Sequence, residues 1–149
     1  MFIGERGHTL TACFEDDLCA PVWGDYSSLQ RLLWILLDNA AKYTPAPGTI
    51  KVALTVSGGR AEVTVEDNGM GISAADLPLI FGRFYRADPS RSQVEGSGLG
   101  LSIAMWIAEI HGASLAAESQ ENAGSIFRVG FRLLDGTASA SERMLAHEI

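Results

Sequence analysis

The stretch LLWILLDNAAKYTP, residues 32–45, decides the fold of this chain. Apolar side chains recur at helical spacing from Tyr26 to Tyr43, which predicts a helix with one apolar face. Asp25 is a possible N-cap in front of this pattern, and the Thr44-Pro45 pair ends it. The stretch therefore predicts a long helix with one buried face.

The rest of the chain predicts strands, short helical turns and one further long helix. Strands alternate apolar and polar residues, and we expect them at TLTACF (9–14), TIKVALTVS (49–57), RAEVTVED (60–67) and, around a turn, within ASLAAESQENAGSIFRVGFRLL (113–134). Gly58-Gly59 joins the second and third strands as a hairpin. SGLGLSIAMWIAEIHG (97–112) predicts the second helix, which Gly112 ends, and ADLPLIFGRFY (75–85) predicts short turns. We expect an α+β fold, a two-layer α/β sandwich in which helices cover one face of a mixed β-sheet.

Composition limits both the size and the partners of the protein. A chain of 149 residues suits one domain, which we expect at 9–134, with a ragged start at 1–8 and a tail or linker at 135–149. The formal charge of −7 argues against nucleic acid and anionic membrane as partners. Cys13 and Cys19 form no metal or redox motif, which favours a reduced, cytosolic setting. We find neither a signal peptide nor an apolar run of the ~18 residues that a membrane span needs.

Four polar residues interrupt the apolar pattern near the end of the first helix: Asp38, Asn39, Lys42 and Tyr43. Asn39, Lys42 and Tyr43 are three and four residues apart and share one helical face, with Ile35 one turn earlier. An amide oxygen, a cation and a phenol side by side suit an anionic ligand that carries a metal and has a flat part. Mg²⁺ often takes one or two protein oxygens together with phosphate oxygens and water. The alternative is a helix end where Lys42 and Tyr43 extend to solvent and Asn39 caps locally.

The stretch EDNGMGIS, residues 66–73, directly follows a predicted strand. Asn68-Gly69 is typical of a tight turn, but no strand follows, and a turn does not need a second glycine at Gly71. Glycines here would let the backbone approach a flat ligand closely. Asp67, at the end of the strand, would accept a hydrogen bond from an exocyclic amine such as that of adenine and would disfavour a keto group.

Two further stretches bear on phosphate binding. GSGLGLSIA, residues 96–104, opens the second helix, and a glycine-rich helix N-terminus either binds phosphate or serves as a flexible hinge. The polar residues 87–97 predict a mobile loop. In IFGRFYRADPSR, residues 80–91, plain packing explains Phe81, Phe84 and Tyr85, whereas Arg86 stands where the loop would bring a guanidinium onto a terminal phosphate.

The four stretches in this order resemble the ATP-binding catalytic domain of bacterial sensor histidine kinases, a branch of the GHKL ATPase superfamily. LLDNAAKYTP resembles the N box, DNGMGI the first glycine box, FGRFYR the F box and GSGLGLSIA the second glycine box. The resemblance covers roughly residues 9–134. It implies a Bergerat-type fold that binds ATP and Mg²⁺ and acts as a protein-histidine kinase.

The resemblance also assigns roles to residues. It implies that Asn39 is the Mg²⁺ ligand, that Asn39, Lys42 and Arg86 serve catalysis, and that Asp67 holds the adenine amine. The residues that it implies for nucleotide binding are Asn39, Lys42, Tyr43, Asp67, Gly69, Gly71, Ile72, Phe81, Arg86, Gly96, Ser97, Gly98, Leu99, Gly100 and Leu101.

The sequence departs from the family pattern at two points. Many relatives carry an asparagine at the position of Ile35, so this chain offers one N-box amide instead of two. The phosphoacceptor histidine is missing, because His8, His111 and His147 all lack its His-acidic helical context. We therefore expect the catalytic half of a longer kinase.

The resemblance also implies partners and a location. The expected partner is the dimerisation and histidine-phosphotransfer domain of the same parent kinase, with a response regulator as an indirect partner. We expect no nucleic acid and no direct membrane contact. The domain would be cytoplasmic, even where the parent is an inner-membrane sensor.

Three further functions remain open on the sequence. A GHKL-type ATPase of the gyrase, mismatch-repair or heat-shock-chaperone kind carries a Glu base where this chain has Ile35. We expect Asp38 to point away from Asn39, about 100° around the helix, and so not to replace that base. A degenerate module that only binds nucleotide and a serine kinase of the anti-sigma type are also compatible with the four stretches.

Overall fold

The structure, a computed structural model, describes residues 7–14, 20–82 and 99–134. Its elements are β1 (Thr9–Cys13), α2 (Tyr26–Tyr43), β2 (Thr49–Ser57), β3 (Arg60–Asp67), the 3-10 helix η1 (Leu77–Leu79), α3 (Gly100–Ile110), β4 (Ser114–Gln120) and β5 (Gly124–Arg132). Each strand and long helix predicted from the sequence is present. Within these ranges no helix combines the length and apolarity that a membrane crossing requires.

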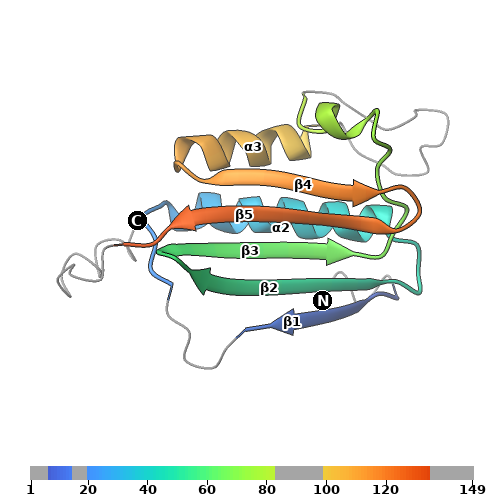
Figure 1. The fold of residues 1–149 in the computed structure, drawn as a ribbon, viewed down its shortest axis with the longest axis horizontal. Coiled ribbons are helices and arrows are strands. Elements are labelled where there is room, and N and C mark those ends of the chain that lie inside the picture. Colours follow the sequence, from blue (N-terminus) through green and yellow to red (C-terminus); the bar gives the residue numbers. More distant parts are fainter. Residues whose placement is uncertain (1–6, 15–19, 83–98, 135–149) are drawn as a thin grey trace.

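The strands form one mixed sheet in the order β1-β2-β3-β5-β4 (Figure 1). β1 runs parallel to β2, and every other neighbouring pair is antiparallel. The hairpin between β2 and β3 turns at Gly58 and Gly59, which both have positive φ. Because β3 pairs with β5, Asp67 at the end of β3 lies opposite Ser125 at the start of β5.

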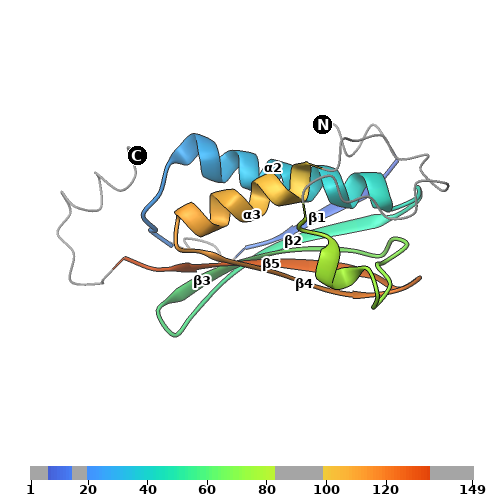
Figure 2. The ribbon, with the colours of Figure 1, turned by 90° about the horizontal axis from the view of Figure 1, so that it is seen from above.

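Helices α2 and α3 lie side by side on one face of the sheet (Figure 2). Their apolar faces and the inward side chains of the central strands form one core. The largest side chains that are fully buried in it are Phe127, Leu32, Leu36, Ile50, Val65 and Val129. The predicted two-layer α+β sandwich is thereby confirmed.

A histidine joins the two helices at one end of the molecule. His111, which follows α3, has Nδ1 2.7 Å from the carbonyl oxygen of Ile107, and its Nε2 lies 3.1 Å from the Asp25 amide. A carbonyl only accepts and an amide only donates, so Nδ1 carries the proton and Nε2 accepts. The Asp25 carboxylate in turn caps α2 by accepting hydrogen bonds from the hydroxyl and the amide of Ser28. These two hydrogen bonds from Ser28 lower the pKa of the Asp25 carboxyl. His111 therefore ties the end of α3 to the start of α2.

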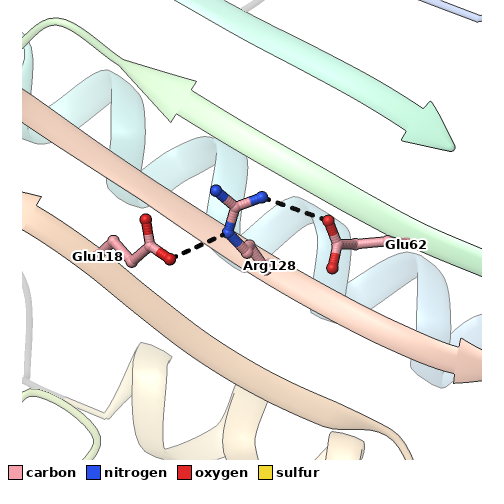
Figure 3. Close-up of polar contacts among 3 residues, drawn as sticks. All are labelled: Glu62, Glu118 and Arg128. Atoms are coloured by element: carbon pink, nitrogen blue, oxygen red, sulfur yellow. Dashed lines mark hydrogen bonds and ion pairs between the residues drawn. The ribbon is translucent and has the colours of Figure 1, made fainter.

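The opposite face of the sheet carries polar side chains. Arg128 of β5 lies between Glu62 of β3 and Glu118 of β4, at N–O distances of 3.3 and 3.5 Å (Figure 3). Glu118, more than Glu62, raises the pKa of the Arg128 guanidinium. These pairs cross three strands on a face that no described helix covers, and half-exposed pairs of this kind contribute little to stability.

Candidate functional site

The last turns of α2 carry the three polar residues that the sequence singled out. Asn39, Lys42 and Tyr43 are all half-buried. Within the described ranges the Asn39 side chain forms no hydrogen bond, so its amide oxygen remains available to a ligand. The local cap that the sequence left open for Asn39 is therefore not formed.

Lys42 does not simply extend into solvent. Its Nζ lies 3.0 Å from Oδ2 of Asp38, one turn earlier, and the two side chains are 29% and 24% exposed. Residues four apart on a helix are neighbours on its surface, so Lys42 reaches back along α2 to Asp38. Asp38, which we expected to point away from Asn39, thus contacts Lys42 of the candidate site.

Asp67 is the buried acid of this region. Its side chain closes the inward-facing row of β3, and the residue is only 6% exposed. Oδ1 accepts a hydrogen bond from the Gly69 amide at 2.9 Å. Loss of hydration raises the pKa of the Asp67 carboxyl above its ordinary value, although the Gly69 amide, the Thr44 hydroxyl and the Ser125 amide act in the opposite direction.

The loop that follows Asp67 is fixed by hydrogen bonds to three other parts of the chain. The Met70 amide donates to the Tyr43 carbonyl at the end of α2, at 3.1 Å, and the Met70 carbonyl accepts from the Asn122 amide at 2.7 Å. The Ile72 amide donates to Ser119 Oγ of β4 at 2.7 Å. The carboxylate of Asp67 is therefore held in place before any ligand arrives.

The glycines of this loop have a packing role that the sequence did not predict. A Cβ on Gly69 would lie 2.3 Å from the Tyr43 carbonyl oxygen, and a Cβ on Gly71, whose φ is +68°, would lie 2.1 Å from the Gln120 carbonyl oxygen. These glycines let the loop lie directly against the end of α2 and the turn between β4 and β5. Contacts within the protein explain why neither residue has a side chain, and close approach of a ligand is not required to explain it.

Three hydroxyl groups surround this region, and sequence reasoning missed them all. Thr44 is 3% exposed and lies close enough to Asp67 to lower the pKa of the carboxyl, but its Oγ1 reaches no partner at hydrogen-bonding geometry among the described residues. Ser125 Oγ and Ser119 Oγ are 2.8 Å apart. In the sequence, only their positions near the ends of a predicted helix and of predicted strands pointed to these residues. That information places them beside Asp67 only once the order of the strands in the sheet is known.

The N-terminus of α3 meets the middle of α2. Among the described residues no side chain caps α3, and the first turn of the helix contains no acidic residue. Leu99 and Leu101 flank Gly100, and a Cβ on Gly100 would be 3.5 Å from Cγ2 of Ile35. The structure thus brings Ile35 to the first amides of α3, and the amides of a helix N-terminus are suited to bind an anion.

Two of the expected nucleotide contacts have core partners. The Phe81 ring meets the Phe127 ring edge to face, with centroids 6.2 Å apart, and Ile72 packs against the same core. Plain packing, which the sequence allowed for Phe81, therefore describes its observed contact. Arg86, Gly96, Ser97 and Gly98, and most of the predicted mobile loop, lie outside the described residues.

The structure describes two of the three histidines. His8, within the expected ragged start, is buried, and its Nε2 donates to the Thr44 carbonyl. His111 holds α2 and α3 together through its two ring nitrogens. His147 lies outside the described residues.

The chemistry of this end of the molecule follows from its groups. A fixed, buried acceptor (Asp67), a free amide oxygen (Asn39), a cation (Lys42) and uncapped helix amides are offered by segments that pack against one another. No group of three or more His, Cys, Asp or Glu able to hold a metal occurs in the described ranges. Mg²⁺ often takes one or two protein oxygens together with oxygens of a ligand and of water, and Asn39 offers one such oxygen.

Comparison with known proteins finds a family model that matches most of this chain. The family model described as "Histidine kinase-, DNA gyrase B-, and HSP90-like ATPase" matches residues 24–135. Sensor histidine kinase YkoH of Bacillus subtilis is 40% identical over 116 residues, which are 77% of this chain and 25% of that protein. Sensor histidine kinase RppB of Synechocystis is 43% identical over 108 residues, 72% of this chain and 24% of that protein. The matched part of this chain thus corresponds to about a quarter of the length of these relatives.

Solved structures agree with the sequence relatives. The mycobacterial sensor histidine kinase MprB matches with a TM-score of 0.73 and 29% identity, over 89% of each chain. The catalytic domain of histidine kinase ThkA matches with a TM-score of 0.74 and 26% identity, over 89% of this chain and 83% of that one.

Proposed function

The chain belongs to the histidine kinase-, DNA gyrase B-, and HSP90-like ATPase family, and from this premise we propose that it is the catalytic domain of a two-component sensor histidine kinase, which binds Mg·ATP and donates the γ-phosphate to a histidine on a separate domain. The observation that carries the proposal is the meeting of the fixed Asp67 loop with the end of α2. The Met70–Tyr43 hydrogen bond joins an acceptor suited to a base amine to the helix that carries Asn39 and Lys42.

Each end of the nucleotide has matching groups on the protein. Asp67 would accept a hydrogen bond from the exocyclic amine of adenine, since its carboxylate only accepts and keeps lone-pair sites beyond the one that the Gly69 amide occupies. Lys42 and the free amides of α3 would bind phosphates, as would Arg86, Gly96, Ser97 and Gly98 if the family pattern holds for them. Tyr43, beside Lys42, would border the sugar or base.

The residues present fit a magnesium ion. Asn39 supplies one hard, unengaged oxygen, and the nucleotide's phosphates and water would supply the others. When bound, the ion would neutralise phosphate charge. The protein's own share is to hold the nucleotide and to keep its terminal phosphate accessible to the acceptor domain, since phosphoryl transfer depends mainly on position and charge.

Ile35 favours kinase over hydrolase among the family's activities. Its side chain lies at the start of α3, next to the free amides proposed to bind phosphate. A hydrocarbon there can neither take a proton from water nor orient one, whereas hydrolysis needs such a group. The domain would therefore keep ATP intact until an acceptor histidine is supplied.

The expected partners follow from the proposal that this domain binds ATP while another domain carries the acceptor histidine. We infer that the dimerisation and histidine-phosphotransfer domain of the parent kinase supplies the acceptor, that a response regulator receives the phosphate from that domain, and that this domain works in the cytoplasm. The share of about a quarter that the chain represents in its relatives supports a parent with further domains.

The proposal is tested by mixing the purified domain, γ-labelled ATP and a separately purified histidine-bearing domain of the parent kinase. We expect label on the histidine domain in an acid-labile bond, and only slow phosphate release without that domain. The Asn39→Ala variant serves as the control for contaminating enzymes. Steady phosphate release by the domain alone, lost in Asn39→Ala, would instead support a hydrolase.

A further inference from the structure

The ion pair between Asp38 and Lys42 lies at the edge of the proposed phosphate site. Lys42 is the cation proposed to meet the phosphates, and Asp38 is its only ion-pair partner in the part of the chain that the structure describes. We propose that Asp38 is a positioning residue that holds the Lys42 ammonium and competes with the nucleotide's phosphates for it, so that it sets how strongly the site prefers a triphosphate to a monophosphate. This inference rests on the proposed function, because it takes Lys42 to be a phosphate contact.

The geometry allows such an exchange of partners. The Nζ–Oδ2 distance of 3.0 Å is that of a direct ion pair, while both side chains keep about a quarter of their surface exposed. Water and ligands can therefore reach the ammonium without any movement of the helix. A lysine ammonium has three donors on a flexible four-carbon stem, so it can turn from one anion to another at little cost.

Electrostatics give the exchange a direction. A free Lys42 would present a full positive charge to an incoming phosphate, whereas the paired Lys42 presents a nearly neutral unit. Lys42 also lies in the last turn of α2, where the helix dipole places partial negative charge. Both Asp38 and the helix end therefore lower the attraction of this corner for anions, and removing the Asp38 charge should raise that attraction.

Asp38 and Asp67 contact different groups, so we expect the Asp38 charge to affect phosphate binding and not base binding. Lys42 is proposed to reach phosphate, whereas the base acceptor Asp67 is held separately by the Gly69 amide. Asp38 acts through Lys42 and has no contact with the Asp67 loop among its described interactions. Binding of AMP, which lacks the distal phosphates, should therefore depend much less on Asp38 than binding of ATP does.

The test measures ATP and AMP affinity by titration calorimetry for the wild type, Asp38→Asn, Lys42→Ala and the double variant. We expect Asp38→Asn to bind ATP about three- to tenfold more tightly, because an ion pair with about a quarter of its surface exposed is stronger than a fully exposed one and weaker than a buried one. AMP affinity should change less than about twofold. In the Lys42→Ala background, Asp38→Asn should have almost no effect, since the residue that it acts through is gone.

Control variants separate this role from competing explanations. Glu109→Gln removes the same charge from the exposed face of α3 and should leave ATP affinity unchanged. Asp38→Ala, checked for folding by thermal unfolding, should reproduce the effect of Asp38→Asn. Equal gains for ATP and AMP, an equal gain without Lys42, or weaker ATP binding by Asp38→Asn would each overturn the proposal. Failure of the wild type to bind ATP at all would instead count against the proposed function.

Discussion

Replacing Asp67 by Asn tests the proposed base recognition with the smallest change of shape. The asparagine keeps one carbonyl oxygen, which can still accept from the Gly69 amide. Its other terminal atom becomes an NH₂ group, which would face the exocyclic amine of adenine as donor to donor. The variant therefore removes a charged acceptor without removing volume.

The size of the effect follows from the burial of this side chain. A carboxylate offers about four lone-pair sites; the Gly69 amide takes one, and the Thr44 hydroxyl and the Ser125 amide lie near others, which still leaves acceptor capacity for a base. Hydrogen bonds to charged groups contribute about 1.5–3 kcal/mol. At about 1.4 kcal/mol per tenfold, ATP affinity should fall roughly 10- to 150-fold. Affinity for GTP should fall less or even rise, because the new NH₂ group can donate to the keto oxygen.

The same side chain predicts a pH dependence. Burial raises the pKa of Asp67 from its ordinary value of 3.8, so the folded state holds the proton more tightly than the unfolded state. Its contribution to stability is therefore greatest below pH 3.8 and is lost as the pH rises through the raised pKa. The difference in the free energy of unfolding between the wild type and Asp67→Asn should therefore decrease as the pH rises through the raised pKa of Asp67. ATP affinity of the wild type should fall as the pH drops through the raised pKa, because the base amine needs an ionised acceptor.

The assay is calorimetric titration of both proteins with ATP and GTP, together with urea unfolding at a series of pH values. Full ATP affinity and unchanged selectivity in Asp67→Asn would refute the base-reading role. An equal loss for ATP and GTP, accompanied by a lower unfolding midpoint, would show that the substitution damages the loop and that the residue does not read the base.

Three further substitutions test other parts of the site. Asn39→Ala should weaken binding of Mg·ATP much more than binding of ATP in EDTA, because it removes the proposed metal ligand; equal losses of affinity in calorimetry would point to lost packing instead. Gly71→Ala should destabilise the domain by about 1–3 kcal/mol more than Gly58→Ala in urea unfolding, since both have positive φ but only the Gly71 Cβ would strike backbone; equal effects would contradict that contact. His111→Ala should lower stability by about 1–3 kcal/mol through two lost hydrogen bonds, and an unchanged unfolding midpoint would contradict the proposed tie between the helices.

Local patterns in the sequence were sufficient to predict most of the fold. The bounds of α2 follow from the capping residue Asp25 and from Thr44-Pro45, and the hairpin follows from Gly58-Gly59. Each of these signals acts within a few residues, so no knowledge of the tertiary structure is needed to use it.

The parts of the site that the sequence missed depend on tertiary contacts. Thr44 and Ser125 are ordinary hydroxyl residues until the pairing of β3 with β5 and the end of α2 bring them to Asp67. The tight packing of Gly69 against Tyr43 likewise cannot be predicted without knowledge of the fold. Asp38 was missed for a different reason, because both relevant spacings are local. Its angle of about 100° to Asn39 around the helix predicts that it points away from Asn39. Its spacing of four residues from Lys42, however, allows the observed ion pair with that residue.

The strand order has a consequence for how the protein is made. β3 lies in the middle of the sheet, between β2 and β5, and β5 is the last of the described strands to leave the ribosome. Until β5 emerges, Asp67 lacks its neighbour Ser125, and the loop after Asp67 is not yet closed by the turn that carries Asn122. The proposed base acceptor is thus one of the last parts of the domain to take shape during synthesis. A nascent or truncated chain without β5 should therefore not retain nucleotide.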